Sequence, residues 1–182
     1  MLFRSIEPDP ENLKILHRRF RFQKKAILVS AAVSKEKGLI HLYQAGAYST
    51  VSQKNQTLLT RPEGFMGGQM KSDQGAIAVP CLSLDSLMQS HGVPDFIKID
   101  VEGWESMVLQ GLSHAVKLIS FESNLPDFLE ETMDCIHQLK QLGDYEFNYV
   151  NADPPDRFSL PSFVSGDVLV ENIRSTNPRY CE

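Results

Sequence analysis

Residues 96–105 of this 182-residue chain read Phe-Ile-Lys-Ile-Asp-Val-Glu-Gly-Trp-Glu. A short apolar strand at 96–99 runs directly into three carboxylates, one glycine and the start of a helix. In an open parallel sheet, ligands bind at this edge, because the carboxyl ends of the strands and the N-termini of the helices converge there. The acids Asp100, Glu102 and Glu105 therefore indicate a chemical site or, at the least, an unusually acidic helix start.

Strands and helices alternate on both sides of this segment. The apolar patterns predict strands at 2–6, 26–33, 39–43, 76–79, 96–99, 116–121, 145–150 and 168–170. They predict helices at 10–22, at 82–88, in a crossover carrying Met107, Val108 and Leu112, and from Pro126 to Gly143. This order predicts one doubly wound α/β domain over residues 1–182. Residues 44–75 are rich in glycine and polar residues without periodicity, which is typical of an irregular insertion or lid.

Composition narrows the class of protein. The chain is 42% hydrophobic and 23% charged, as expected of a soluble globular domain. Its net charge of −5 and its lack of basic runs argue against nucleic acid as a partner. No apolar stretch approaches the ~20 residues that span a bilayer. Three widely spaced cysteines, Cys81, Cys135 and Cys181, are typical of reduced thiols, so we expect a cytoplasmic protein.

Three of the predicted strands end in acids, namely Glu7, Asp100 and Glu122. If these strands are parallel members of one sheet, the three acids share one edge. The strands at 96–99 and 116–121 are joined by a single short crossover helix, so we expect Asp100 and Glu122 to face each other across a pocket. Carboxylates placed close together raise the pKa of one of them, which suits a general base.

Each acid also has a simpler interpretation. Asp100 is an ordinary helix-capping residue, and Glu102 and Glu105 favour a helix start through the helix dipole. Glu7 with Asp9 forms common helix-start chemistry, in which Asp9 caps the helix and Pro10 takes its first position. The residues alone leave these alternatives open.

Lys98 and Trp104 carry alternatives of the same kind. Lys98 lies on the same strand face as Asp100, where it is either a buried lysine paired with an acid or a side chain that extends off the sheet edge. Trp104 is more typical of a packing residue than of a substrate platform.

Two segments in this order resemble the FkbM-type S-adenosylmethionine-dependent methyltransferases. Residues 5–12, Ser-Ile-Glu-Pro-Asp-Pro-Glu-Asn, resemble the corner after that family's second strand. Residues 97–105, followed by Val-Leu-Gln-Gly at 108–111, resemble its most distinctive segment. Residues 31–34 with Gly38, residues 79–87 and the pair Phe121-Glu122 match in the same order, so the resemblance covers residues 2–125.

The resemblance implies a Rossmann-like class I methyltransferase sheet, mostly parallel with an antiparallel final strand. It implies S-adenosylmethionine as the cofactor, with Glu7 on the ribose hydroxyls, Val33 and Ser34 near the adenine, and Asp100 near the methionine end and the transferred methyl. An acid at the end of the second strand of such a sheet generally binds a ribose.

The resemblance also implies the reaction. The catalytic residues that the resemblance implies are Asp100, Glu102 and Glu122. Of these, Glu102 and Glu122 would line the acceptor side. The acceptor would be a hydroxyl of a sugar or small metabolite, which undergoes O-methylation. No metal is required, although three carboxylates also suit Mg²⁺.

The chain departs from the family pattern at two points. The family's first strand and its glycine-rich loop should precede residue 2, so we expect an N-terminally truncated form of the fold. Lys35 also stands where the family often has an acid. Two alternatives therefore remain: a non-catalytic remnant or binding module with this fold, and a Mg²⁺-dependent phosphoryl or sugar-nucleotide enzyme that uses Asp100, Glu102 and Glu122.

Overall fold

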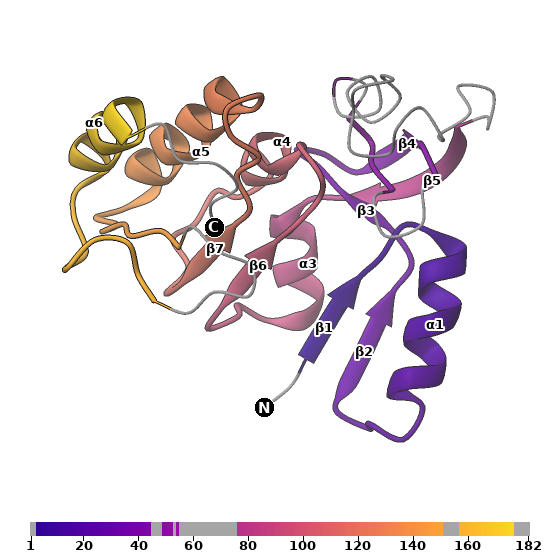
Figure 1. Ribbon diagram of the computed structural model, residues 1–182. Helices are drawn as coiled ribbons and strands as arrows, with labels where there is room; N and C mark the ends of the chain where they lie inside the picture. The colour runs from indigo at the N-terminus through magenta and orange to yellow at the C-terminus, as the bar shows by residue number, and fades with distance from the viewer. Residues whose placement is uncertain (1–2, 45–48, 53, 55–75, 151–156, 177–182) are drawn as a thin grey trace.

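The computed structural model describes residues 3–44, 49–52, 54, 76–150 and 157–176 (Figure 1). The insertion or lid predicted at 44–75 lies mostly outside these residues. The helices and strands are, in chain order, β1 (Phe3–Ile6), α1 (Pro10–Phe20), β2 (Ala26–Val29), β3 (Ala32–Val33), β4 (Gly38–Leu42), β5 (Ile77–Leu82), α3 (Leu84–His91), β6 (Ile97–Ile99), α4 (Glu105–Leu109), β7 (Ile119–Phe121), α5 (Leu129–Leu142) and α6 (Gly166–Thr176).

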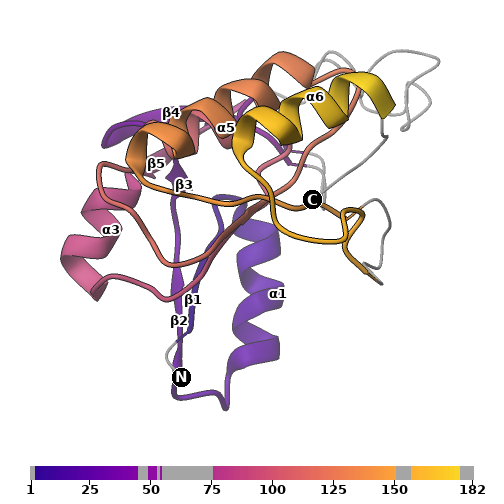
Figure 2. The ribbon, with the colours of Figure 1, turned by 90° about the vertical axis from the view of Figure 1, so that its left-hand side faces the viewer.

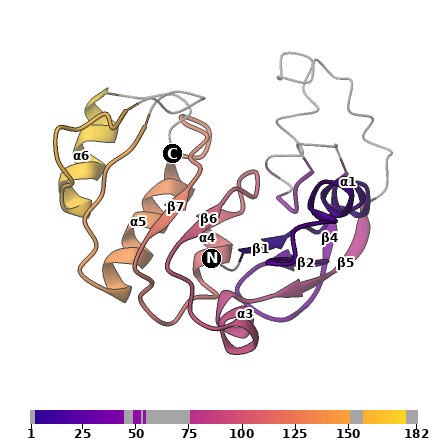
Figure 3. The same cartoon turned by 90° about the horizontal axis from the view of Figure 1, so that it is seen from below.

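The strands form three small sheets. β1 pairs with β2 in parallel, β6 pairs with β7 in parallel, and β5 lies between β3 and β4. Figure 3 shows β6 and β7 on the side of α5 and α6, and β1 and β2 on the side of α1. The mixed α/β class and the parallel pairs agree with the sequence, whereas a single continuous sheet is not present in the described part of the chain.

The strand predicted at 26–33 is in fact two strands in different sheets. The backbone N–H of Ala31 donates to the carbonyl of Val29, 3.2 Å away, and this tight turn ends the ladder with β1. The chain resumes as β3, which pairs with β5 in parallel. β4 confirms the strand predicted at 39–43 and pairs with β5 in the antiparallel sense.

The helix signals near the N-terminus are confirmed. Asp9 caps α1 by accepting the backbone N–H of Glu11 at 2.8 Å, and Pro10 is the first helical residue. α5 ends at Gly143 as expected, but it begins at Leu129 rather than at Pro126.

The C-terminal part of the chain does not form the two strands that the sequence predicted. Residues 168–170 do not form a strand but belong to α6, because burial there follows the helical spacing of Leu169 and Ile173. Residues 145–150 form no ladder, and only one antiparallel bridge joins Phe147 to Val164. Figure 2 shows α6 lying along α5, where Gly166 allows close contact with Ile136. The antiparallel final strand is therefore wrong for the described residues.

The main hydrophobic core lies where β6 and β7 meet helices α3 to α6. Its most buried members include Ile99, Val108, Leu109, Ile136 and Leu139. A smaller core beneath the β3–β5–β4 sheet includes Leu42 and Val79. By contrast, α1 contains no fully buried residue.

Two further sequence expectations concern cysteines and membranes. Cys81 and Cys135 are buried and free, whereas Cys181 lies outside the described residues. None of the described helices is both long enough and apolar enough to cross a membrane.

Candidate functional site

The turn between β6 and α4, residues 100–104, carries two of the predicted site acids and is called the acid turn below. Because β6 and β7 are hydrogen-bonded neighbours, with Ile99 opposite Phe121, Asp100 and Glu122 leave the sheet side by side. Carboxylate oxygens of Asp100, Glu102 and Glu122 all lie within 4.8 Å of one another. The predicted proximity of Asp100 and Glu122 is therefore confirmed, and the pocket expected between them stays a prediction.

The capping interpretation of Asp100 does not hold. α4 begins at Glu105, and its N-cap residue is Trp104, which makes no side-chain capping bond. Asp100 instead lies 3.5 Å from the ammonium group of Lys98. The Lys98 side chain is 41% exposed, so of its two interpretations the side chain that extends off the sheet edge holds, and it does so while paired with an acid. In the described residues β6 pairs on one side only, which gives Lys98 a route to solvent.

The environment of Glu122 raises the pKa of its carboxyl group. Burial raises the pKa of Glu122, and the negative charge of Asp100 raises it further. The Asn124 amide, 3.3 Å from the Glu122 carboxylate, and the charge of Lys98 oppose these effects. A carboxyl with a raised pKa is a better proton acceptor near neutral pH.

The acid turn has an unusual backbone. Glu102 has a φ of 55° and Gly103 a φ of 85°, so two successive residues adopt the left-handed region. For glutamate this conformation is uncommon and carries strain. A Cβ on Gly103 would also overlap the ring of Phe128, so glycine is required there for two reasons. Surrounding contacts must therefore hold this turn in shape.

Glu105 supplies two of these contacts. Its Oε1 accepts the backbone N–H of Val101 at 3.1 Å and that of Gly103 at 3.3 Å. The residue is only 5% exposed, and burial raises its pKa to about 7 in spite of these hydrogen bonds. The sequence indicated Glu105 as part of a chemical site or as a favourable residue for the helix dipole, and so missed that it folds back onto the acid turn.

The second acidic corner follows β1. The Oε1 of Glu7 accepts the backbone N–H of Asp9 at 2.8 Å, so Glu7 does take part in the helix start. Glu7 is also half-buried, and burial raises its pKa, with a further contribution from the charge of Asp9. Asp9 is 1% exposed, and its Oδ2 accepts the hydroxyl of Ser49 at 2.7 Å.

Residues 49 and 50 connect the two corners. Ser49 binds Asp9, and the hydroxyl of the next residue, Thr50, donates to the carbonyl of Glu102 at 2.8 Å. Thr50 is 1% exposed and also accepts the backbone N–H of Ser52 at 3.0 Å. Sequence reasoning missed both residues, because the aperiodic segment around them carries no signal of long-range contacts.

Val33 and Ser34, predicted near the adenine, contact the main core and the acid turn. Val33 packs against the main core. Ser34 is 6% exposed, and its hydroxyl accepts the indole N–H of Trp104 at 3.2 Å. The structure therefore joins Ser34 to the end of the acid turn rather than to Glu7.

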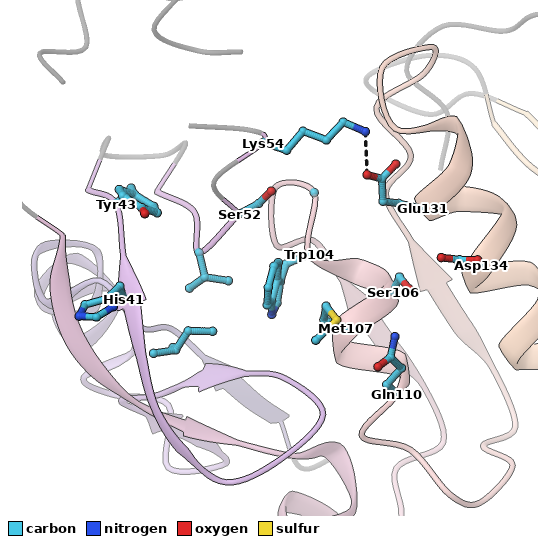
Figure 4. A pocket seen from close by; sticks show the side chains of 13 residues that line it. His41, Tyr43, Ser52, Lys54, Trp104, Ser106, Met107, Gln110, Glu131 and Asp134 are labelled. Atoms are coloured by element: carbon cyan, nitrogen blue, oxygen red, sulfur yellow. Dashed lines mark hydrogen bonds and ion pairs between the residues drawn. The ribbon is translucent and has the colours of Figure 1, made fainter. Parts of the chain in front are cut away.

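A pocket of about 480 Å³ lies between β4, α4 and α5 (Figure 4). Trp104 stands in its centre, and Lys54 reaches across to pair with Glu131 at 2.7 Å. The volume is in the range of small-molecule sites. The lining residues are Ile40, His41, Tyr43, Val51, Ser52, Lys54, Gly103, Trp104, Ser106, Met107, Gln110, Glu131 and Asp134.

The pocket and the carboxyl cluster share the acid turn but not their side chains. Gly103 and Trp104 line the pocket, whereas Asp100 and Glu122 do not. Trp104 packs against the main core, as the sequence favoured, and it also lines the pocket.

Parallel strand pairs that end in acids are typical of α/β proteins that bind their ligands at the strand ends. Comparison with family models identifies the family within this class, because the model of the methyltransferase FkbM domain matches residues 2–149. The chain therefore belongs to the FkbM methyltransferase family. The resemblance seen in the sequence is confirmed, and the match extends beyond residue 125 through α5. No curated protein and no solved structure gives a significant match.

Proposed function

We propose that the protein transfers a methyl group from S-adenosylmethionine to a hydroxyl of a sugar or another small molecule. Membership of the FkbM methyltransferase family supports methyl transfer in general. The observation that carries the finer proposal is Glu122, a half-buried carboxyl beside Asp100 whose pKa is raised. A hydroxyl must lose a proton as it is methylated, and Glu122 has the properties of the base that takes it.

The residues of the two corners fit the cofactor at its ribose and methyl ends. Glu7 is a half-buried carboxylate at the end of a parallel strand, which suits hydrogen bonds from ribose hydroxyls. Asp100 leaves the end of β6, where we place the methionine end. The Ser34 hydroxyl already accepts a hydrogen bond from the indole N–H of Trp104. Contact with the adenine would therefore be made by the backbone of Ser34 and by Val33. The sequence holds no GxGxG turn, and no residues are assigned to the carboxypropyl group.

The bound cofactor supplies an electrophilic methyl carbon, and the residues of the chain supply position and proton transfer. Glu122 accepts the proton of the acceptor hydroxyl, and Glu102 orients that hydroxyl. Asp100 remains paired with Lys98 at 3.5 Å and keeps the electrostatic conditions that raise the pKa of Glu122. Holding the acceptor oxygen in line with the methyl group is the larger part of such catalysis.

Calorimetric titration of the full chain with S-adenosylmethionine tests the cofactor assignment. We expect the wild-type chain to bind, and Glu7→Gln to weaken binding by about tenfold or more, because a ribose hydroxyl loses its anionic acceptor. Glu130→Gln, an exposed acid on α5, is the matched control and should bind like the wild type. Absence of binding to the wild type would favour a non-catalytic binding module, and equal affinity of Glu7→Gln would remove Glu7 from the site.

A second candidate is a Mg²⁺-dependent phosphoryl or sugar-nucleotide enzyme, and the carboxyl cluster favours it. Three carboxylates with oxygens within 4.8 Å of one another resemble a Mg²⁺ ligand set. If this candidate is right, Mg²⁺ raises the melting temperature of the wild type but not that of Asp100→Asn. An identical melting temperature in Mg²⁺ and in EDTA would count against it.

A further inference from the structure

The two acidic corners belong to separate sheets. Glu7 follows β1 and Asp100 follows β6, and in the described part of the chain no backbone ladder joins the β1–β2 pair to the β6–β7 pair. Figure 1 shows β6 beside β7 and β1 beside β2. A site that uses both corners therefore needs another means of setting the distance between them.

Ser49 and Thr50, called the strut below, make contact with both corners. The Ser49 hydroxyl donates to Asp9 Oδ2 at 2.7 Å, and the Thr50 hydroxyl donates to the Glu102 carbonyl at 2.8 Å. Asp9 and Thr50 are each 1% exposed. Hydrogen bonds buried in this way are strong constraints, since a buried polar group left unpaired is costly.

The strut acts on one particular peptide unit. Thr50 holds the carbonyl of the peptide between Glu102 and Gly103, and Glu105 holds the N–H of that same peptide at 3.3 Å. The plane of this peptide is therefore fixed from both sides. It lies between the two residues with positive φ, so its orientation determines where the acid turn presents Glu102.

At its other end, the strut is fixed to a helix. Asp9 is the N-cap of α1, and its Oδ1 accepts the backbone N–H of Glu11 at 2.8 Å. Its own backbone N–H binds Glu7 at 2.8 Å. Asp9 is therefore the single residue that connects Ser49 to Glu7, and a shift of Ser49 moves Glu7 through it.

We propose that Ser49 and Thr50 are positioning residues that set the distance between Glu7 and the acid turn. This inference rests on the proposed function, in which Glu7 and Asp100 hold opposite ends of one cofactor. The strut then keeps the distance between Glu7 and Asp100 matched to the length of the cofactor.

Trp104, the single tryptophan of the chain, reports on the acid turn directly. In Thr50→Val, which keeps the shape but removes the hydroxyl, we expect acrylamide quenching of Trp104 to rise by roughly twofold, because the turn opens locally. Thr50→Ser should restore the wild-type value. Thr132→Val is the matched control, since Thr132 is 4% exposed and donates to the Phe128 carbonyl at 2.9 Å.

A purely structural role predicts a different result. In that case Thr50→Val and Thr132→Val lower the melting temperature alike, and neither changes the quenching of Trp104, which would overturn the inference. Should Thr50→Val fail to fold, Ser49→Ala releases the other end of the strut and should raise the quenching in the same way. An unchanged value in Ser49→Ala would likewise overturn it.

Affinity for S-adenosylmethionine supplies the second arm. We expect Ser49→Ala and Thr50→Val each to weaken binding by about tenfold, and the double variant to be no weaker than either, because both break the same link. Additive losses would show two independent contacts instead of a strut. If the wild type binds no S-adenosylmethionine, the proposed function fails, and the quenching arm still decides the role of the strut.

Discussion

The β6–β7 side of the molecule and the β1–β2 side each present an acidic corner, but they support it differently. Behind the acid turn lies the main core, with Val108 and Leu109 of α4 almost fully buried. Behind Glu7 stands α1, which has no fully buried residue, and Phe3 of β1 is 47% exposed. The first corner therefore has apolar packing behind it as well as hydrogen bonds from Glu105 and Thr50, whereas the second depends mainly on buried polar contacts through Asp9.

A region with little apolar burial can still hold its site residues in a defined geometry. Hydrophobic burial is not directional and holds an element in place without selecting one geometry. Hydrogen bonds to buried partners are directional, so Asp9 can orient Glu7 even though little apolar surface lies beneath it. The predictions below test this difference between the two sides.

The largest expected effect comes from the same truncation made on each side. Leu109→Ala, at a residue 1% exposed in the main core, should lower the free energy of unfolding by about 3 kcal/mol, because it leaves a cavity. Leu16→Ala, at a half-buried position of α1, should lower it by only about 1 kcal/mol. Urea unfolding followed by circular dichroism measures both. Equal losses would contradict the contrast between the two sides.

Glu105 should give the main-core side a dependence on pH. Its pKa is raised by burial from 4.5 to about 7, so between these values the folded state binds more protons than the unfolded state. Stability therefore falls as the pH rises from 4.5 through 7, by up to about 3 kcal/mol. The free energy of unfolding of Glu105→Gln should not show this part of the decrease with rising pH.

The comparison of Glu105→Gln with the wild type isolates one group. Burial also raises the pKa of Glu7 and of Glu122, and these residues stay in both proteins, so their effects largely cancel in the difference. Urea unfolding at pH 5 and pH 8 is sufficient. Parallel changes in the two proteins would mean that Glu105 titrates normally.

The smallest effect separates backbone strain from packing. Gly92 and Gly103 have almost the same positive φ, 84° and 85°, but only at Gly103 would a Cβ meet another side chain, the ring of Phe128. Gly92→Ala should lose about 1 kcal/mol or somewhat more through its backbone conformation alone, because a φ of 84° with a ψ of 163° lies in a region that is essentially restricted to glycine. Gly103→Ala should lose about 1 kcal/mol more, because Phe128 must shift. Thermal unfolding of the two variants compares them, and identical losses would show that the Phe128 contact relaxes freely.

Local signals in the sequence predicted a large part of this architecture. Asp9 and Pro10 marked the start of α1, Gly143 marked the end of α5, and one short crossover placed Asp100 beside Glu122. In each case the residues that interact are close in the chain or joined by one element, so local rules apply. The Val-Leu-Val run at 168–170 misled, because branched residues favour strands while packing on α5 selected a helix there.

The strut and the pocket had no such signal. Thr50 meets Glu102 across 52 positions in the chain, and Trp104 meets Ser34 across 70. A serine or threonine in an aperiodic segment has the same local preferences whether it is buried or solvated. Its partner depends on how the sheets are placed, which no local pattern encodes.

The sequence by itself determined the family and the positions of the acids at the ends of β1, β6 and β7, because strand ends, caps and motifs depend on neighbouring residues. Only the tertiary structure decided that Glu105 turns inward, that Thr50 holds the carbonyl of Glu102, and that Trp104 lines a pocket. These features arise when distant segments are buried together, and burial requires each polar group to find whichever partner the fold brings near.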